Sequence, residues 1–219
     1  MRDMKRGIKS EDSFQQFVER VIKYIVRHKE TSIWLGIGII GGIVFLVYFL
    51  TNTEADSPEA DLLHTQAISM LSMGRVQEAE NVFRELTEKY LGTRPGKIAL
   101  YYLGIINYHT GRFAEALDYF NRFLGKVSND HLLTPSAYFG AGCAAEGLKD
   151  YERAMKYYEK IARNKDSPFY FWGMLAWGRL TGLCGNPQKA IEILEELIKQ
   201  NPPYDVISDA KYYIGYFNR

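Results

Sequence analysis

Few residues in this chain suit catalysis or metal binding, and those few are scattered. The sequence has two cysteines and four histidines among 219 residues: Cys143, Cys184, His28, His64, His109 and His131. No two histidines have the H-x-x-x-H spacing of a metal site on one helix face. The acidic cluster Glu192, Glu195 and Glu196 falls on a predicted solvent face instead of forming an acid–base pair. We therefore expect no metal, no cofactor and no enzymatic activity, with an enzyme or its regulatory subunit as the alternative.

Net charge is also almost absent, with 27 Lys and Arg against 26 Asp and Glu and a formal charge of +1. Proteins that bind nucleic acids usually carry a strong basic excess, so we expect no nucleic-acid partner. The charges are unevenly placed, however. Residues 1–30 hold eight Lys and Arg against five acidic residues, and residues 31–53 hold no charge at all.

The charge-free stretch contains a long apolar run at residues 33–50. As a helix this run would span roughly 27 Å, close to the hydrocarbon thickness of a bilayer. It predicts a transmembrane anchor at residues 31–53. Its length, its long basic lead and its bulky end do not fit a cleaved signal peptide.

The anchor contains the letters GIGIIGG at residues 36–42, which match the G-x-G-x-x-G spelling of a dinucleotide-binding loop. Such a loop needs a preceding strand and polar surroundings, and an apolar run offers neither. In lipid, glycine lets helices approach closely, so Gly38 and Gly42 are candidates for helix packing in a homodimer. Alternatively, these glycines reflect only the high frequency of glycine in membrane helices.

The basic lead orients the anchor, because positively charged flanks stay in the cytoplasm. This predicts a cytoplasmic segment at residues 1–30, an acidic linker at 54–60 and an extracytoplasmic remainder. The lead also has apolar residues at helical spacing: Phe14, Phe17, Val18, Val21 and Ile25. They predict a basic amphipathic helix that lies on the lipid bilayer or binds a partner.

Beyond the linker, small residues recur in pairs twelve positions apart, which we call the paired positions. They are Ala67 and Ala79, Gly104 and Ala116, Gly142 and Ala154, and Gly178 and Ala190. Four positions after each second member stands a large apolar residue: Phe83, Phe120, Tyr158 and Leu194. Because these spacings place apolar residues on one helix face, each unit is predicted to be a helical hairpin with closely packed helices.

Turn and cap residues fit the same hairpins. Gly74, Gly111 and Gly185 stand five positions before the second paired residue, where the chain must turn, and Lys149 takes that place in the third unit. Hydroxyl side chains followed by proline predict three helix starts, at Ser57, Thr134 and Ser167.

These units resemble the tetratricopeptide repeat family. The letters ALYYLGIINYHTGRFAEALDYFNRFL and SAYFGAGCAAEGLKDYERAMKYYEKIA carry its helix-turn-helix signature, and the units recur every 36 to 38 residues, slightly more than the family's usual step of about 34. The resemblance implies an all-α protein. We expect a tetratricopeptide-type α-solenoid of about four helical hairpins at residues 61–219, ending in a C-terminal capping helix around Gly215 and preceded by one transmembrane helix.

The layout as a whole resembles bacterial inner-membrane tetratricopeptide proteins that serve as ancillary subunits of the Sec translocon. That resemblance implies a single-pass protein with a cytoplasmic N-terminus and a periplasmic repeat domain. It would act as a scaffold or chaperone-like factor for exported polypeptides beside the translocon. Scaffolds for envelope assembly or cell division are the alternative, although these usually have a cleaved signal or a lipid-bearing cysteine.

In a stack of such hairpins the first helices line a concave groove. The residues projected to face it are mostly aromatic: Tyr101, Ile105, Tyr108, Phe139, Trp172, Arg179, Tyr212 and Tyr216. Aromatic anchors favour a peptide or helix from another protein as the ligand. Family members that clamp a C-terminal carboxylate carry Lys and Asn at such positions, and this chain does not. Alternatively, several of these side chains pack between hairpins.

The two cysteines fall at different places in the repeat, with Cys143 in mid-helix and Cys184 beside a turn. An oxidising compartment would permit a disulfide between them. Small buried helical thiols are the favoured alternative.

Overall fold

The structure of the chain is a computed structural model that describes residues 16, 18–20, 23–24, 27, 29–52 and 56–219. It divides into two compact units, residues 1–53 and residues 54–219. The described residues form helices and no strand. An all-α protein is therefore confirmed for this part of the chain.

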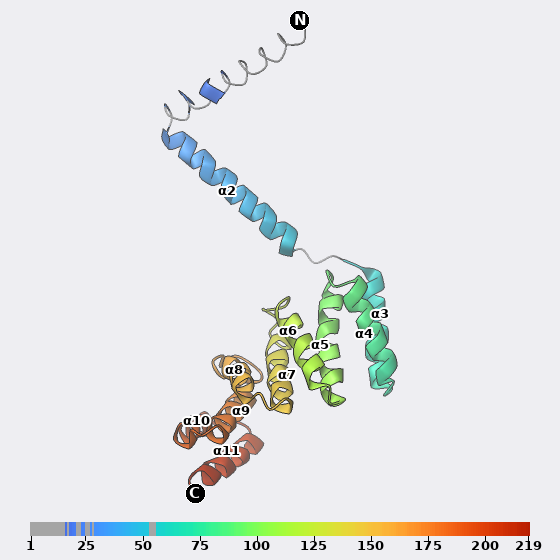
Figure 1. The fold of residues 1–219 in the computed structure, drawn as a ribbon, viewed down its shortest axis with the longest axis vertical. Coiled ribbons are helices and arrows are strands. Elements are labelled where there is room, and N and C mark those ends of the chain that lie inside the picture. Colours follow the sequence, from blue (N-terminus) through green and yellow to red (C-terminus); the bar gives the residue numbers. More distant parts are fainter. Residues whose placement is uncertain (1–15, 17, 21–22, 25–26, 28, 53–55) are drawn as a thin grey trace, which may run out of the picture. The chain divides into compact units, whose positions relative to one another are not determined.

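The first unit contains helix α2, Lys29–Asn52, of 24 residues (Figure 1). Its side chains are described at Trp34 and at residues 37–48, where all are exposed. A Cβ atom built on Gly38 or Gly42 would meet nothing within 4 Å, so their role in helix packing stays a prediction.

The predicted anchor, at residues 31–53, extends beyond the side chains that the structure describes. Among the described residues, no helix combines the length and the apolar character that crossing a membrane requires. The predicted amphipathic segment at residues 1–30 also lies largely outside the described residues.

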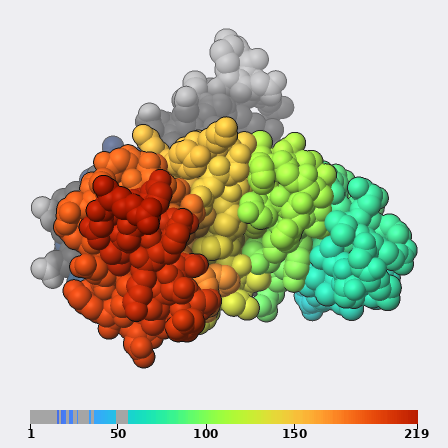
Figure 2. Space-filling model, turned by 90° about the horizontal axis from the view of Figure 1, so that it is seen from below, coloured from blue at the N-terminus to red at the C-terminus, as the bar shows by residue number. Residues whose placement is uncertain are grey.

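The second unit is a stack of helical hairpins. Its helices are α3 Pro58–Ser72, α4 Val76–Lys89, α5 Arg94–His109, α6 Phe113–Leu124, α7 Leu133–Gly147, α8 Tyr151–Ala162, α9 Tyr170–Leu183, α10 Pro187–Lys199 and α11 Tyr204–Phe217. Each hairpin pairs two consecutive helices, from α3–α4 to α9–α10, and α11 packs on the last one. The hairpins follow one another in chain order along the unit (Figures 1 and 2). The predicted four hairpins and terminal helix are confirmed.

Close packing at the paired positions holds each hairpin together. A Cβ atom built on Gly104 would lie 2.7 Å from the Phe120 ring, and one on Gly142 would lie 2.5 Å from the ring of Tyr158. At Gly178 the Leu194 side chain would be 2.8 Å away. Only glycine leaves room for these large side chains, and the alanines at the other paired positions are fully buried. The role predicted for the paired positions is confirmed.

The turns within the hairpins use the left-handed backbone region. Gly74, Gly111 and Gly185 have φ values of 74°, 76° and 96°. Lys149 adopts a φ of 61° at the matching place in the third hairpin. The turn geometry is therefore common to all four hairpins, although a side chain disfavours it at Lys149.

The predicted helix starts are correct in part. The Ser57 side chain caps α3 by accepting a hydrogen bond from the Ala60 N–H at 3.3 Å. The start predicted at Thr134 is wrong, because α7 begins earlier and Asp130 Oδ1 accepts from the Leu133 N–H at 2.7 Å. Helix α9 begins beyond Ser167 and its proline.

Candidate binding groove

Helices α5, α7 and α9 bring five of the eight projected groove residues together. A pocket of about 310 Å³ is lined by Tyr101, Ile105, Tyr108 and Phe139. A second pocket of about 430 Å³ is lined by Tyr108, Phe139 and Arg179. The two pockets adjoin, since Tyr108 and Phe139 line both, and we call them together the α5–α7–α9 groove.

The repeat register explains why these residues meet. Tyr101 and Phe139 each stand three positions before a paired glycine, and Ile105 and Arg179 each stand one position after one. Positions three or four residues apart share one helix face. Stacked first helices therefore align the same face, and the groove runs from α5 past α7 to α9.

Tyr101 is held firmly in the groove wall. Its hydroxyl lies 2.6 Å from Ser136 Oγ on the neighbouring first helix. Its ring packs at a tilt against Phe123 and edge-on against Phe120, with centroid distances of 5.7 and 6.1 Å. The apolar end of the groove is thus formed before any ligand arrives, which lowers the entropy cost of binding.

Arg179, the positively charged residue of the groove, already forms an ion pair with Glu146. Arg179 Nη2 donates to Glu146 Oε1 and Oε2 at 2.7 and 2.8 Å, and the two side chains are 24% and 21% exposed. The Tyr158 hydroxyl also donates to Glu146 Oε1, at 2.7 Å. A ligand carboxylate would have to displace Glu146 to reach Arg179. The pair leaves the groove without a net charge there.

Glu146 was not predicted as a groove residue, although its position could have revealed it. It stands four positions after the paired glycine Gly142, as Tyr108 does after Gly104. The projected groove positions were mostly aromatic, and this acidic residue at an equivalent position was not among them.

The Cys143 thiol and the hydroxyls of Tyr108 and Tyr158 stay protonated at neutral pH. Burial is the main cause that raises the pKa of Cys143, whose Sγ lies 3.3 Å from the Tyr158 hydroxyl. Burial likewise raises the pKa of Tyr108 and of Tyr158. A thiol in such a setting is a poor nucleophile, so the groove offers surface for binding instead of reactive groups.

Three projected residues lie outside these two pockets. Trp172 on α9 is 40% exposed and packs against Phe169 with a centroid distance of 6.4 Å. Tyr212 and Tyr216 on α11 are 66% and 52% exposed. All three are available to a ligand, and their role in binding stays a prediction.

The cysteines and histidines form no reactive cluster in the described part of the chain. Both Cys143 and Cys184 are free thiols, the first half-buried and the second exposed, so the expected burial is wrong for Cys184. No group of three metal-ligating side chains occurs among the described residues. His64 packs against the rings of Phe83 and Tyr102, which stack on each other, and burial lowers its pKa.

Comparisons with known proteins agree with this architecture. Two family models, both described as tetratricopeptide repeat, match residues 64–131 and 135–166. Similar solved structures include a tetratricopeptide repeat protein from Parabacteroides merdae, 15% identical with a TM-score of 0.64 over 74% of this chain and 61% of that one. MamA from Desulfovibrio magneticus is 20% identical with a TM-score of 0.52, over 64% of this chain and 74% of that one.

The structure of PilF from Pseudomonas aeruginosa is also similar, at 17% identity and a TM-score of 0.52 over 73% of this chain and 75% of that one. At such identities the likeness concerns the fold alone. A comparison with curated protein sequences gives no match.

Proposed function

We propose that this chain, which carries tetratricopeptide repeats, is a membrane-anchored scaffold that binds polypeptides in its α5–α7–α9 groove. The observation that carries the proposal is the pair of adjoining pockets that shares Tyr108 and Phe139. Their aromatic and aliphatic lining suits an apolar side chain as anchor. The protein works by binding and not by catalysis.

The groove favours apolar segments over charged ones. Tyr101 and Ile105 line the pocket that lacks the Glu146–Arg179 pair, so an aliphatic or aromatic anchor is desolvated there. The ion pair at the other end carries no net charge. Its polar atoms can hydrogen-bond to the backbone of an extended or helical ligand, which gives orientation without sequence specificity.

We further propose that α2 and its flanks anchor the chain in the inner membrane, with the repeats in the periplasm. The charge-free run at residues 33–50 and the basic lead before it support this orientation. Anchoring would confine the groove to the membrane surface and raise its effective concentration near membrane-embedded partners.

The proposed partners are exported polypeptides and the Sec translocon. The sequence layout, with its basic lead, single anchor, acidic linker and exported repeats, supports this choice. A scaffold for envelope assembly or cell division fits the same groove, and the identity of the neighbouring proteins separates the two functions.

Site-specific photocrosslinking in intact cells tests the proposal. A photoreactive amino acid at Ile105 should capture exported polypeptides or translocon subunits, and Tyr108→Ser should reduce the capture because it removes the wall shared by both pockets. Tyr204→Ser is the matched control, since Tyr204 is 85% exposed on α11 and does not line the groove pockets. Capture that survives Tyr108→Ser unchanged would rule out this groove as the binding site.

A further inference from the structure

The constant repeat register allows the junctions between hairpins to be compared position by position. We call α4, α5 and α6 the first junction, and α6, α7 and α8 the second. The third junction consists of α8, α9 and α10. In each, the second helix of one hairpin packs against the first helix of the next. Residues at the same distance from the paired positions occupy equivalent places.

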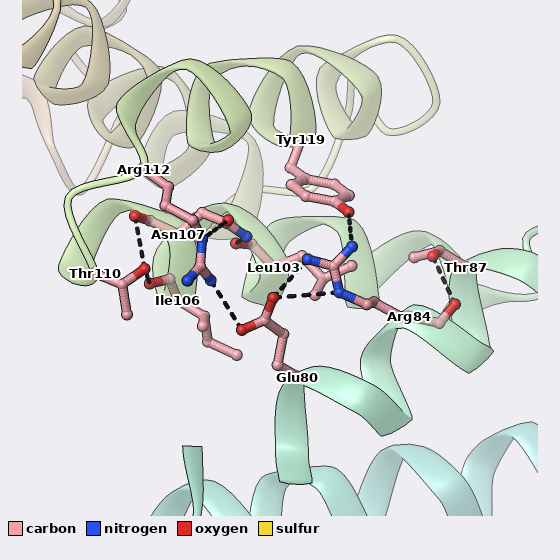
Figure 3. A network of polar contacts seen from close by, with 9 residues as sticks. All are labelled: Glu80, Arg84, Thr87, Leu103, Ile106, Asn107, Thr110, Arg112 and Tyr119. Atoms are coloured by element: carbon pink, nitrogen blue, oxygen red, sulfur yellow. Dashed lines mark hydrogen bonds and ion pairs between the residues drawn. The ribbon is translucent and has the colours of Figure 1, made fainter. Parts of the chain in front are cut away.

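Two arginines fill the first junction (Figure 3). Glu80, whose side chain is 5% exposed, accepts from Arg84 Nη2 at 2.6 Å and from Arg112 Nη2 at 2.8 Å. Arg112 Nε donates to Asn107 Oδ1 at 2.6 Å, and Arg84 Nη1 donates to the Tyr119 hydroxyl at 3.0 Å. Guanidinium groups thus occupy the space between the hairpins.

The third junction has the same backbone places and different side chains. Met155 replaces Glu80, Glu159 replaces Arg84, Trp177 replaces Leu103, Thr181 replaces Asn107, Cys184 replaces Thr110 and Asn186 replaces Arg112. No arginine is present at these six positions. All six line a cleft of about 410 Å³, together with Glu152, Lys156 and Lys189.

The second junction shows that this space need not stay open. There Leu117 stands in the place of Glu80 and Met155 and is buried, and Ala141 and Ala145 are buried beside it. The first junction is therefore closed by ion pairs and the second by apolar contacts. The third is open. The open one has a volume within the range of about 300–1,000 Å³ that is usual for ligand sites.

The side chains around the cleft suit a cation that has a flat face. Trp177 contributes an indole ring, and Lys189 Nζ already lies 5.9 Å from its centroid. Glu152 and Glu159 contribute carboxylates from α8, and Arg163 pairs with Glu159 at 2.8 Å on the exposed side. An exposed pair of this kind contributes little and can be exchanged.

We propose that the third-junction cleft binds an arginine side chain presented by a polypeptide partner. The guanidinium stacks on Trp177, takes the place of Lys189 and donates hydrogen bonds to Glu152 and Glu159. Guanidinium is preferred over the ammonium of lysine because it is planar, less strongly hydrated and able to donate two parallel hydrogen bonds. An acidic side chain would meet Lys156 and Lys189, but also the two carboxylates.

This site is separate from the α5–α7–α9 groove. On α9, Arg179 lines the groove, whereas Trp177 and Thr181 line the cleft. Residues two positions apart on a helix point in directions roughly 200° apart. The same helix therefore serves a groove for apolar segments on one side and a cleft for arginine on the other.

Ligand-observed NMR on the full-length chain tests the proposal with four probe peptides, acetyl-Gly-X-Gly-amide with X as Arg, Lys, Leu or Asp. The arginine peptide should bind about threefold to tenfold more tightly than the lysine peptide, and the leucine and aspartate peptides should bind less still. Equal binding of all four peptides, or preference for the aspartate peptide, would overturn the proposal.

Two sets of variants locate the binding. Trp177→Leu introduces the residue of the first junction, and Glu152→Gln with Glu159→Gln removes the carboxylates from an exposed and a half-buried position while keeping the side-chain size. Each should abolish the preference for arginine over lysine, while Tyr108→Ser in the groove should leave it intact. Arginine preference that persists in the double glutamine variant would contradict the proposed site.

Filling the cleft from within gives an independent test. The exchange of Met155→Glu, Glu159→Arg, Thr181→Asn and Asn186→Arg copies the first-junction network into the third. The introduced guanidiniums should occupy the cleft and reduce arginine-peptide binding at least about tenfold. If this folded variant binds the peptide as well as the parent chain does, the cleft is not the site.

Discussion

The first and third junctions use equivalent backbone positions. Side chains fill the space in the first junction, whereas the third contains an open cleft. In the first, Glu80 on α4 pairs with Arg84 on the same helix and with Arg112 at the start of α6, in the next hairpin (Figure 3). In the third, methionine and asparagine stand at two of those places and no ion pair fills the space. Repetition of the fold fixes where a site can form, and a few side chains decide whether that place supports stability or binding.

The largest expected difference between the two junctions is in stability. Replacing both Arg84 and Arg112 by Ala should lower the free energy of unfolding by about 3 kcal/mol, because Glu80 would remain buried without its cations. Replacing Asn186, the third-junction counterpart of Arg112, by Ala should lower it by only about 1 kcal/mol, because the change removes just the side-chain cap that accepts from the Lys189 N–H at 3.2 Å. Urea denaturation measures both. Equal losses at the two junctions would contradict the comparison.

Low pH should destabilise the first junction more than the third. Burial opposes the charged form of Glu80, but hydrogen bonds and charges from Arg84 and Arg112 outweigh it and lower its pKa from 4.5. The ionised carboxylate therefore stabilises the fold above pH 4.5, and this contribution is lost as the pH falls through the lowered pKa. Glu80→Gln should flatten the stability profile below pH 4.5, as followed by urea denaturation. An unchanged profile would mean that Glu80 is not paired.

The turn of the third hairpin should be the easiest of the four turns to stabilise by a substitution. Lys149 adopts the left-handed conformation that glycine adopts in the other three turns. Lys149→Gly should raise the free energy of unfolding by about 0.5–1 kcal/mol, since the relief of steric strain exceeds the entropy that glycine adds to the unfolded chain. Lys149→Ala, which keeps a Cβ atom, should give no such gain.

The last comparison concerns the reactivity of the two thiols and not the stability of the fold. Cys184 is exposed at the cleft, whereas burial raises the pKa of Cys143 in the groove. Alkylation at neutral pH should modify Cys184 at least about tenfold faster than Cys143. The acetyl-Gly-Arg-Gly-amide peptide should slow the reaction at Cys184 alone. Mass spectrometry follows both sites, and slowing at Cys143 instead would place the peptide in the groove.

Local spacing predicted the hairpins well, because the physical cause lies within each unit. A glycine such as Gly142 must face a large side chain such as Tyr158, and a separation of twelve residues across one turn brings them together. The same register predicted five groove residues that α5, α7 and α9 bring into two pockets. Helix starts were less predictable, since Asp130 accepts from the Leu133 N–H one turn earlier and the Thr134 hydroxyl donates to the Val127 carbonyl instead.

The junctions could not be predicted from the composition of single helices. Glutamate on a second helix was expected to face solvent, and Glu192, Glu195 and Glu196 do. Glu80 is buried because Arg112, thirty-two residues later, reaches across to it. Such pairing depends on how one hairpin is placed on the next, which no pattern within a helix reveals.

Hydrogen exchange of the full-length chain in detergent micelles tests the central claim, that the α5–α7–α9 groove binds polypeptide. An unfolded polypeptide such as reduced and carboxymethylated α-lactalbumin should slow exchange in α5 and α7, where the ligand contacts the helices, and leave α4 unchanged. The Tyr108→Ser variant should lose this protection. Protection that is absent, or equal in α4 and α5, would contradict the account.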